Sequence, residues 1–520
     1  MGQGPSLSRR ALLAGAAAAL AGCDELAHVE GGFSGGAAFE RGHRLRDTRT
    51  WSAPRTSRRT QVLIAGAGIA GLAAARALRR RGIEDFMLLD LEDAPGGNSR
   101  GTQLAGIACP LGAHYLPVPG DAAREVQDFL EELGLRKRVA GRWVYDERHL
   151  CHSPQERVFF RGAWQEGLLP VQGVDAVTLA QYRRFAQRVD ALGRQARFAI
   201  PIAHDAAARA HPELDALTFA AWLDREGFDD ALLRGYLDYC CRDDYGAGLA
   251  TISAWAGIHY FAARHGFQAP GTSDGVNDAP LTWPEGNAWL ARRLADPLQG
   301  RWRGGRIVVR IEPQRHGVAV DALDAATGEI ERWQALHCIV ALPAFVAARV
   351  VVGAPDFLVR KAAATQYAPW VVANLHLRAP LADHGGAAPA WDNVIHGSPS
   401  LGWVDARHQS LDPRPGPTVL TWYHAPGPTA RAGVLRKPWS EWRDAIVAEL
   451  SQPHPDLAGK LTRLEVARYG HAMAIPTPGA LALAGAPSRW GRISFAHADY
   501  SAYSIFEEAF TQGERAGAAV

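Results

Sequence analysis

The chain has neither a large net charge, which would favour binding to a charged polymer, nor a long apolar run, which would favour crossing a membrane. Its 56 basic and 54 acidic residues leave a formal net charge of +2, which gives no reason to expect nucleic acid or an anionic surface as a partner. No run of about 20 apolar residues occurs in the sequence, so we expect no transmembrane helix. With 47% hydrophobic residues, the chain has enough apolar material for large globular cores.

Cysteine is also scarce, and its spacing argues against a metal site. Six cysteines occur in 520 residues, and none shows the spacing of a zinc site, so no metal is predicted. The adjacent Cys240 and Cys241 are more typical of small core residues than of a redox pair. The other four are Cys23, Cys109, Cys151 and Cys338.

The residues from Gln61 to Asp90 have the order of a dinucleotide-binding βαβ unit. An apolar strand over 61–65 runs into Gly66-Ala67-Gly68-Ile69-Ala70-Gly71. An Ala/Leu/Arg-rich segment to about residue 81 predicts a helix, and a second strand over 86–89 ends on Asp90. A glycine pattern alone is weak, but all five parts in the right order predict a bound dinucleotide.

Each part of this unit has a physical task. Gly66 allows a tight turn, and Gly68 allows backbone N–H groups to approach a pyrophosphate. Ile69 and Ala70 open the helix, whose N-terminus offers unpaired donors and a positive dipole end to the phosphates. Gly71 allows the helix to pack closely on the strand. Asp90 is placed to accept hydrogen bonds from a ribose diol.

A second glycine motif, Gly96-Gly97-Asn98-Ser99-Arg100, follows the second strand. Here the chain resembles the flavin-containing amine oxidoreductases, the family of monoamine and polyamine oxidases, which carry a GGR-type motif against FAD. The resemblance implies FAD contacts through Gly97, Asn98, Ser99 and Arg100. Asn98 takes the usual arginine position, and Arg100 lies two residues later. Residues 111–115, Leu-Gly-Ala-His-Tyr, echo the next landmark of the family without its acid.

The resemblance continues to the end of the chain. A strand over 306–311 matches the adenine-side strand of the family and implies a cofactor contact at Val308. Residues 506–516, FEEAFTQGERA, resemble the closing helix, whose N-terminus faces the flavin pyrimidine ring in the family. This implies that Phe506 and Glu507 contact the cofactor. The acid that follows the last strand in the family corresponds to Asp499 if the loop is shifted.

These anchors predict an α/β fold with a Rossmann-type FAD-binding domain that is discontinuous in sequence. The insertions are expected to form an α+β substrate domain, with the first insertion mainly helical and the second mainly sheet. We expect an FAD domain of residues 60–118, 284–350 and 480–520, and a substrate domain of residues 119–283 and 351–479.

The first 59 residues predict export and anchoring. Ser8-Arg9-Arg10 fits a twin-arginine signal over residues 1–22, and Leu20-Ala21-Gly22-Cys23 has the form of a lipobox. The pattern predicts lipidation of Cys23, a membrane anchor and a location at the periplasmic face of the bacterial cytoplasmic membrane. A plain signal peptide with an incidental cysteine is the alternative. Residues 23–59 are rich in Gly, Arg, Ser and Thr and predict a flexible tether.

The resemblance implies oxidation of an amine C–N bond by hydride transfer to FAD, with O₂ or a membrane carrier as acceptor. FAD is expected to be noncovalent, because no cysteine lies near the C-terminal flavin segment. Candidates for the flavin face are His114, Tyr115, Tyr503 and Arg349, but the sequence assigns none of them a catalytic role. The cluster at 242–245, Arg-Asp-Asp-Tyr, fits a solvated helix end, although its carboxylates would suit a cationic amine tail.

Two other functions remain open at this stage. Relatives on this fold desaturate isoprenoids or oxidise porphyrinogens, and a lipid anchor would suit such a membrane-soluble substrate. The third possibility is a lipoprotein that binds FAD without catalysis. The substrate, the electron acceptor and the oligomeric state are not predicted, because one fold serves several chemistries.

Overall fold

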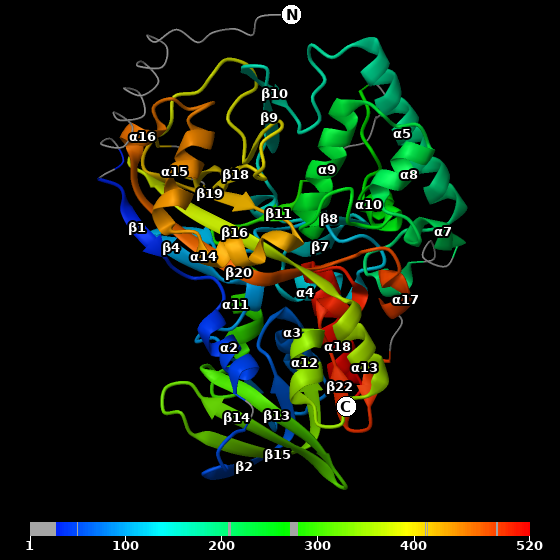
Figure 1. Cartoon of the computed structure of the whole chain (residues 1–520), viewed down its shortest axis with the longest axis vertical. Helices are drawn as coiled ribbons and strands as arrows, with labels where there is room; N and C mark the ends of the chain where they lie inside the picture. The colour runs from blue at the N-terminus through cyan, green and yellow to red at the C-terminus, as the bar shows by residue number, and fades with distance from the viewer. Residues whose placement is uncertain are drawn as a thin grey trace, which may run out of the picture.

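The computed structural model describes residues 26, 28–48, 50–205, 210–270, 279–410, 412, 414–484 and 487–520 (Figure 1). In this view the domain that contains the predicted dinucleotide-binding unit forms the lower part of the molecule, and a second domain forms the upper part. Across these residues, no helix has both the length and the apolar character that crossing a membrane requires. The expected twin-arginine signal, lipobox and Cys23 lie outside the described residues.

The lower domain is built on one mixed sheet, in which β15 is central. This strand runs parallel to β2 and β22 and antiparallel to β14. The predicted strands at 61–65 and 86–89 are β2 and β3, which pair in parallel. The strands are β2 (Thr56–Ala65), β3 (Phe86–Leu89), β12 (Trp302–Arg303), β13 (Arg306–Gln314), β14 (Gly317–Asp324), β15 (Ile330–Val340), β21 (Arg489–Trp490) and β22 (Ile493–Phe495).

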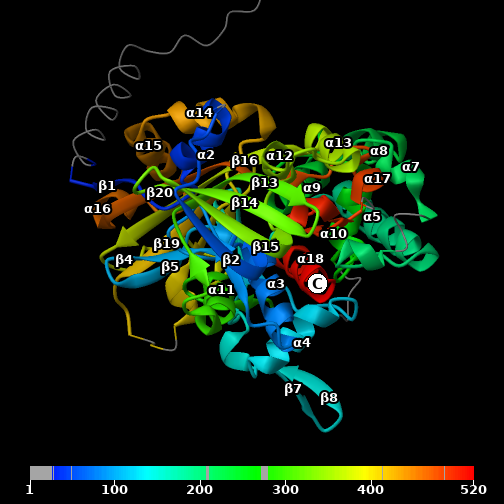
Figure 2. The same cartoon turned by 90° about the horizontal axis from the view of Figure 1, so that it is seen from below.

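Helices α3 (Ile69–Arg80) and α18 (Phe506–Ala518) lie side by side against this sheet (Figure 1 and Figure 2). Their contact is unusually close because small residues line both helices. A Cβ added at Gly513 would lie 2.1 Å from the backbone oxygen of Ala70, and one at Gly517 would lie 2.5 Å from that of Ala74. The two helices therefore approach backbone to backbone, although more than 400 residues separate them in sequence.

The upper domain contains a second eight-stranded sheet, with strand order β1-β20-β16-β19-β18-β17-β9-β10. Its longest strands, β16 and β20, pair antiparallel. The strands are β1 (Glu30–Phe33), β9 (Glu156–Phe160), β10 (Ala163–Glu166), β16 (Gln366–Leu377), β17 (Asp392–Ile395), β18 (Trp403–Asp405), β19 (Thr418–His424) and β20 (Leu461–Ile475). The small pairs are β4 (Gly101–Leu104) with β5 (Ile107–Pro110), β6 (Tyr115–Leu116) with β11 (Leu281–Thr282), and β7 (Arg136–Val139) with β8 (Arg142–Tyr145).

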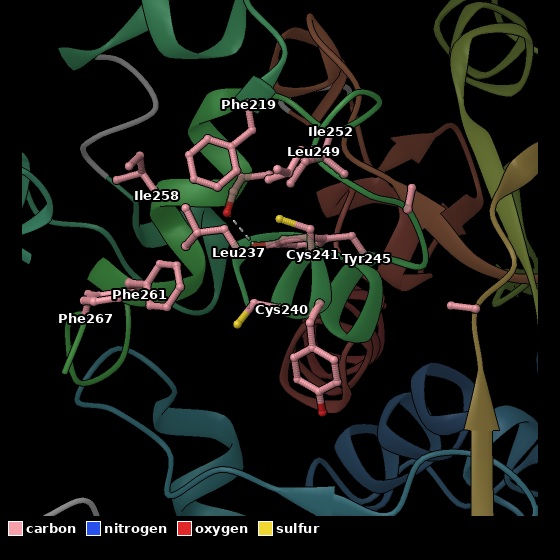
Figure 3. Close-up of a cluster of buried hydrophobic side chains, with 14 of the residues drawn as sticks. Phe219, Leu237, Cys240, Cys241, Tyr245, Leu249, Ile252, Ile258, Phe261 and Phe267 are labelled. Carbon is pink, nitrogen blue, oxygen red and sulfur yellow. Dashed lines mark hydrogen bonds between the residues drawn. The ribbon is translucent and has the colours of Figure 1, made fainter. Parts of the chain in front are cut away.

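A bundle of helices from the first insertion packs beside this sheet. Its core includes Phe219, Leu237 and Ile258, with Cys240 and Cys241 among them. Both cysteines are free and buried, and their sulfurs point to different sides of α9 (Figure 3). The helices of the bundle are α5 (Ala176–Gln195), α7 (Pro212–Asp215), α8 (Phe219–Arg225), α9 (Ala231–Tyr245) and α10 (Ala254–Ala262). The first helix of the insertion, α4 (Arg124–Glu132), instead packs against α18 in the core of the lower domain, although residues from 119 onward are expected in the substrate domain.

The remaining helices cover the junction of the domains and the outer face of the second sheet. Helix α13 packs its Leu358 into the core of the lower domain, although residues from 351 onward are expected in the substrate domain. These helices are α11 (Ala288–Ala295), α12 (Ala344–Val350), α13 (Asp356–Ala364), α14 (Arg431–Arg436), α15 (Trp439–Leu450), α16 (Leu457–Lys460) and α17 (Ala480–Ala484). The mixed α/β fold expected from the sequence is confirmed.

The N-terminal segment corrects one expectation. Residues 30–47 are not a free tether, because β1 pairs in parallel with β20 and a nine-residue helix, α2 (Phe39–Asp47), follows it. Figure 1 shows α2 at the junction of the two domains. A Gly- and Arg-rich composition is typical of linkers, but here the segment gains its structure from strand pairing and ion pairs with the rest of the fold.

Candidate active site

A cavity of about 1120 Å³ lies between the domains and is lined by residues of both. It brings together most of the residues that the sequence predicts at a cofactor. Helix α3 and the two glycine motifs line one part, and the start of α18 lines another. The predicted residues in its wall are Gly66, Gly68, Ile69, Ala70, Asp90, Gly97, Asn98, Ser99, Val308, Phe506 and Glu507.

The glycine-rich turn leaves room for phosphates at the start of α3. Gly66 has a φ of +104°, and a Cβ there would lie 2.3 Å from the backbone oxygen of Ala341, so only glycine fits. The nearest atom to a Cβ at Gly68 is 3.9 Å away, so the space in front of Gly68 is open. No side chain caps the N-terminus of α3, and its N–H groups are available to a pyrophosphate.

Asp90 ends β3 at the same part of the cavity. Its carboxylate accepts hydrogen bonds from the N–H of Ala67 at 2.5 Å and of Glu92 at 2.7 Å. Burial raises the pKa of Asp90 to about 6. The carboxylate is held in place by the turn and lines the cavity, which fits it to accept hydrogen bonds from a ribose diol.

Three residues of the predicted cofactor set do not line the cavity, which corrects Arg100 and Asp499 as contacts and leaves Gly71 with its expected packing task. Gly71 lies behind the wall, where a Cβ would meet the Gly66 oxygen at 1.9 Å, so it serves packing. Arg100 donates to the Gly97 oxygen at 3.0 Å and pairs with Glu92 at 3.2 Å. Asp499 is fully buried outside the wall, and its carboxylate accepts from the Ala344 N–H at 2.7 Å at the start of α12. All three residues therefore act within the protein fold at positions outside the cavity wall.

The start of α18 forms the other end of the cavity. Ile505, Phe506 and Glu507 line it, and no side chain caps the helix N-terminus. Burial raises the pKa of Glu507 to about 7. An uncapped helix N-terminus stabilises negative charge, which fits the pyrimidine end of a reduced flavin. Together the two uncapped helix ends and Asp90 form a set of groups that fits a flavin dinucleotide.

An aromatic wall faces the cavity from the upper domain. The ring of His114 stacks on Tyr423 with centroids 4.3 Å apart, and Tyr115 and Trp391 contact the same ring at 5.0 and 5.5 Å. Burial lowers the pKa of His114 to about 3, so the imidazole is neutral at physiological pH. Trp370 also lines the cavity. The sequence did not indicate this residue, because a tryptophan in an apolar strand is normally interpreted as a core residue.

The other two flavin-face candidates have structural partners. The hydroxyl of Tyr503 accepts a hydrogen bond from Arg264 at 2.5 Å and donates one to Asp244. Tyr503 itself is not part of the cavity wall, although both of its partners line the cavity. Arg349 lines the cavity, but it donates to the backbone oxygen of Leu45 at 2.6 Å and to that of Arg46 at 2.8 Å. Arg349 therefore holds the end of α2 and is not free to act at a flavin.

Three carboxylates that form no ion pair within the described part of the chain make up an acidic cluster beside the aromatic wall: Asp243, Glu156 and Asp392. Glu156 on β9 lies directly opposite Asp392 on the parallel strand β17. Asp243 on α9 lines the cavity, which corrects the interpretation of its segment as a solvated helix end. Among the residues that the structure describes, none of the three forms an ion pair, whereas the neighbouring Asp244 pairs with Arg264 at 3.1 Å.

Ionisation of all three carboxylates of the acidic cluster is unfavourable in the absence of a cation. Desolvation raises the pKa of Asp243 and of Glu156 to about 7. Burial, followed by repulsion from Asp243 and Glu156, raises the pKa of Asp392 well above its usual value. Glu156 is solvent-exposed, whereas Asp243 and Asp392 are half-buried, and only Asp243 of the three lines the cavity. A group of neighbouring carboxylates without ion-pair partners favours a cationic ligand.

The comparison with known families identifies the class of protein. The family model described as flavin-containing amine oxidoreductase matches residues 69–520. The chain belongs to this family, and it is a flavin-dependent oxidoreductase. The predicted family membership is thereby confirmed.

Individual relatives match more distantly. AofH of Mycobacterium tuberculosis, assigned by name to the flavin-containing monoamine oxidases, is 26% identical over 283 residues, which are 54% of this chain and 56% of AofH. Polyamine oxidase 1 of Zea mays is 39% identical over 56 residues, which are 11% of each chain. The chain thus spans about half or less of the length of these relatives.

The solved structures show the same fold over nearly the whole chain. Putrescine oxidase bound to putrescine has a TM-score of 0.68 at 19% identity and covers 89% of this chain and 99% of its own. Cyclohexylamine oxidase from Brevibacterium oxydans IH-35A has a TM-score of 0.65 at 17% identity and covers 88% of this chain and 98% of its own. At these identities the likeness shows the fold alone.

Proposed function

We propose that the protein is an FAD-dependent oxidase or dehydrogenase of a diamine or polyamine, which it attacks at a C–N bond. The observation that carries the proposal is the acidic cluster next to the aromatic wall of the cavity. Unpaired carboxylates repel anionic ligands and gain no partner from apolar ones, whereas a second ammonium group on the substrate would neutralise them. A carotenoid or a porphyrinogen offers no such group, so the cluster disfavours both.

In this mechanism the protein binds and orients, and the flavin supplies the hydride acceptor for the carbon next to the nitrogen. The neutral His114 and the rings of Tyr115 and Tyr423 exclude water around the reacting amine, which favours its uncharged form. Asp243 and its two neighbours hold the distal ammonium. The substrate would therefore lie with its reacting amine at the aromatic rings and its distal ammonium group at the acidic cluster. The product imine then hydrolyses in water.

We further propose that FAD binds noncovalently and is reoxidised by O₂ or a membrane carrier. The five cysteines at positions 109, 151, 240, 241 and 338 are buried, and none lines the cavity. A covalent thioether to the flavin would need a cysteine in the cavity wall. Denaturation of the purified protein should therefore release all of its flavin.

Anaerobic reduction of the flavin by paired amines tests the proposed substrate class. Putrescine and spermidine should bleach the visible flavin absorbance, whereas butylamine, with one amino group and the same chain length as putrescine, should do so far more slowly. Equal bleaching by putrescine and butylamine would contradict the proposal that the acidic cluster binds a second ammonium group. No bleaching by any amine in the FAD-loaded protein would favour a substrate without nitrogen or a protein without catalysis.

Export as a twin-arginine lipoprotein is a separate proposal that rests on the sequence of residues 1–23 alone. Lipidation of Cys23 would anchor the enzyme at the periplasmic face of the membrane. Mass spectrometry of the mature N-terminus in a bacterial host should find a lipidated Cys23. Replacing Arg9 and Arg10 by lysine should retain the precursor in the cytoplasm. Unchanged export of this variant would contradict the twin-arginine route.

A further inference from the structure

Helix α2 is anchored to the fold at both ends but has no buried residue. Its Phe39, Gly42, His43, Leu45 and Arg46 face the cavity. A nine-residue helix held against a domain would normally bury an apolar stripe there. The half-exposed face of α2 instead borders the cavity, where Leu45 packs against the core of the lower domain while Phe39 and His43 stay half-exposed.

The anchors of α2 are specific and come from the nucleotide-binding domain. The N–H of Ala38, at its start, donates to Glu92 at 2.8 Å. Arg41 donates to the Leu91 oxygen at 2.8 Å and forms a bidentate ion pair with Asp93. These partners follow Asp90 directly in sequence, so the start of α2 lies over the end of β3, where a ribose would bind.

The end of α2 and the segment before it are held as firmly. The side chain of Arg349 donates to two backbone oxygens in the last turn of α2, at 2.6 and 2.8 Å. Arg100, from the second glycine motif, donates to the backbone oxygen of Gly36. The guanidinium of Arg468 lies 3.5 Å from the ring centroid of Phe33 and 5.6 Å from that of Phe39. Five side chains of the lower and upper domains thus position a helix that has little packing of its own.

We propose that α2 is a wall of the cofactor site and that Phe39 and His43 contact the adenosine half of the dinucleotide. The partner of these two half-exposed side chains is then the nucleotide itself, which would lie between α2 and the wall formed by Asp90, Ile307 and Val308. In this arrangement the cofactor is enclosed by the N-terminal segment, and Arg349 and Arg100 act as positioning residues for that segment. The proposal rests on the FAD site of the proposed function and is independent of the amine substrate.

Limited proteolysis of the apoprotein tests this directly, because α2 carries three trypsin sites at Arg41, Arg44 and Arg46. FAD and ADP should both slow cleavage within residues 39–47, since both carry the adenosine diphosphate half. Riboflavin should give no protection there. Binding of FAD and ADP with unchanged cleavage of α2, or equal protection by riboflavin, would overturn the assignment. A protein that takes up no FAD would overturn the cofactor part of the proposed function as well.

Paired variants separate the inner and outer faces of α2. Phe39→Ala combined with His43→Ala should speed FAD release about tenfold, measured by the rise of flavin fluorescence after dilution. Glu40→Ala changes an exposed residue of the same helix outside the cavity wall and should leave the release rate unchanged. Equal release rates in wild type and the double variant would refute the contact, even with a correctly folded helix.

Discussion

Replacing Asp243 by asparagine is expected to slow the reduction of the flavin by putrescine about 100-fold. The same change should stabilise the apoprotein above pH 7. Asp243 is the member of the acidic cluster that lines the cavity, and no cation in the described part of the chain pairs with it. Loss of a carboxylate that holds an ammonium group in a partly desolvated site costs about 2–5 kcal/mol of binding. The reaction with butylamine should change little, because it has no second ammonium group to hold.

The stability effect follows from the raised pKa of Asp243, which is about 7. In the unfolded chain this carboxyl ionises near pH 4, so between about pH 4 and 7 the unfolded state loses a proton that the folded state keeps. Folding stability is therefore fully present below pH 4 and falls as the pH rises through 7. Asparagine does not ionise, so D243N should gain of the order of 2 kcal/mol over wild type at pH 8 and nothing at pH 4.

Thermal unfolding of both apoproteins across this pH range, and stopped-flow reduction of both holoenzymes, provide the measurements. Glu166→Gln is the matched control, because Glu166 is an exposed carboxylate on β10, the strand next to Glu156 in the same sheet. It should leave both properties unchanged. A D243N enzyme that keeps its selectivity for putrescine over butylamine would contradict the assignment of the distal ammonium site.

The second large effect is expected at the glycine turn, where alanine substitutions at two nearby glycines should affect different properties, one FAD affinity and the other stability. Gly68→Ala should fold normally and bind FAD about 100-fold more weakly. Its Cβ meets no atom within 3.9 Å, but it stands where the pyrophosphate approaches the uncapped N–H groups of α3. Two charge-assisted hydrogen bonds lost at about 1.5 kcal/mol each account for this factor.

Gly66→Ala should instead lower the stability of the apoprotein by about 3 kcal/mol. A Cβ there would meet the Ala341 oxygen at 2.3 Å, and the φ of +104° is unfavourable for any other residue. Fluorescence titration with FAD and thermal unfolding of the apoprotein separate the two effects. Gly193→Ala, in α5 with no atom near its added Cβ, is the control for both. Normal FAD affinity in G68A would place the pyrophosphate elsewhere.

Local patterns in the sequence predicted the cofactor side of the site well. The order of strand, glycines, helix and acid from Gln61 to Asp90 is a local signal, and both helices that point into the cavity were expected from it and from the family resemblance. Asp499 was harder to place, because its role depends on the course of a loop. The structure uses its carboxylate to cap α12.

The substrate side depends on contacts between distant residues. Glu156 and Asp392 are 236 positions apart, and only the parallel pairing of β9 with β17 brings them side by side. Helix α2 was missed for a related reason. Its composition is that of a linker, and the ion pairs that stabilise it involve residues from other parts of the chain, such as Arg349. Neither feature leaves a periodic pattern in its own segment.

The close contact between α18 and α3 has a consequence for how the enzyme is made. Helix α18 packs its Gly513 and Gly517 on α3, and β22 joins the same sheet just before it. The first βαβ unit leaves the ribosome early but lacks this support until residues 506–518 have been synthesised more than 400 residues later. A chain truncated before residue 506 would therefore lack both the packing partner of α3 and one end of the cavity wall.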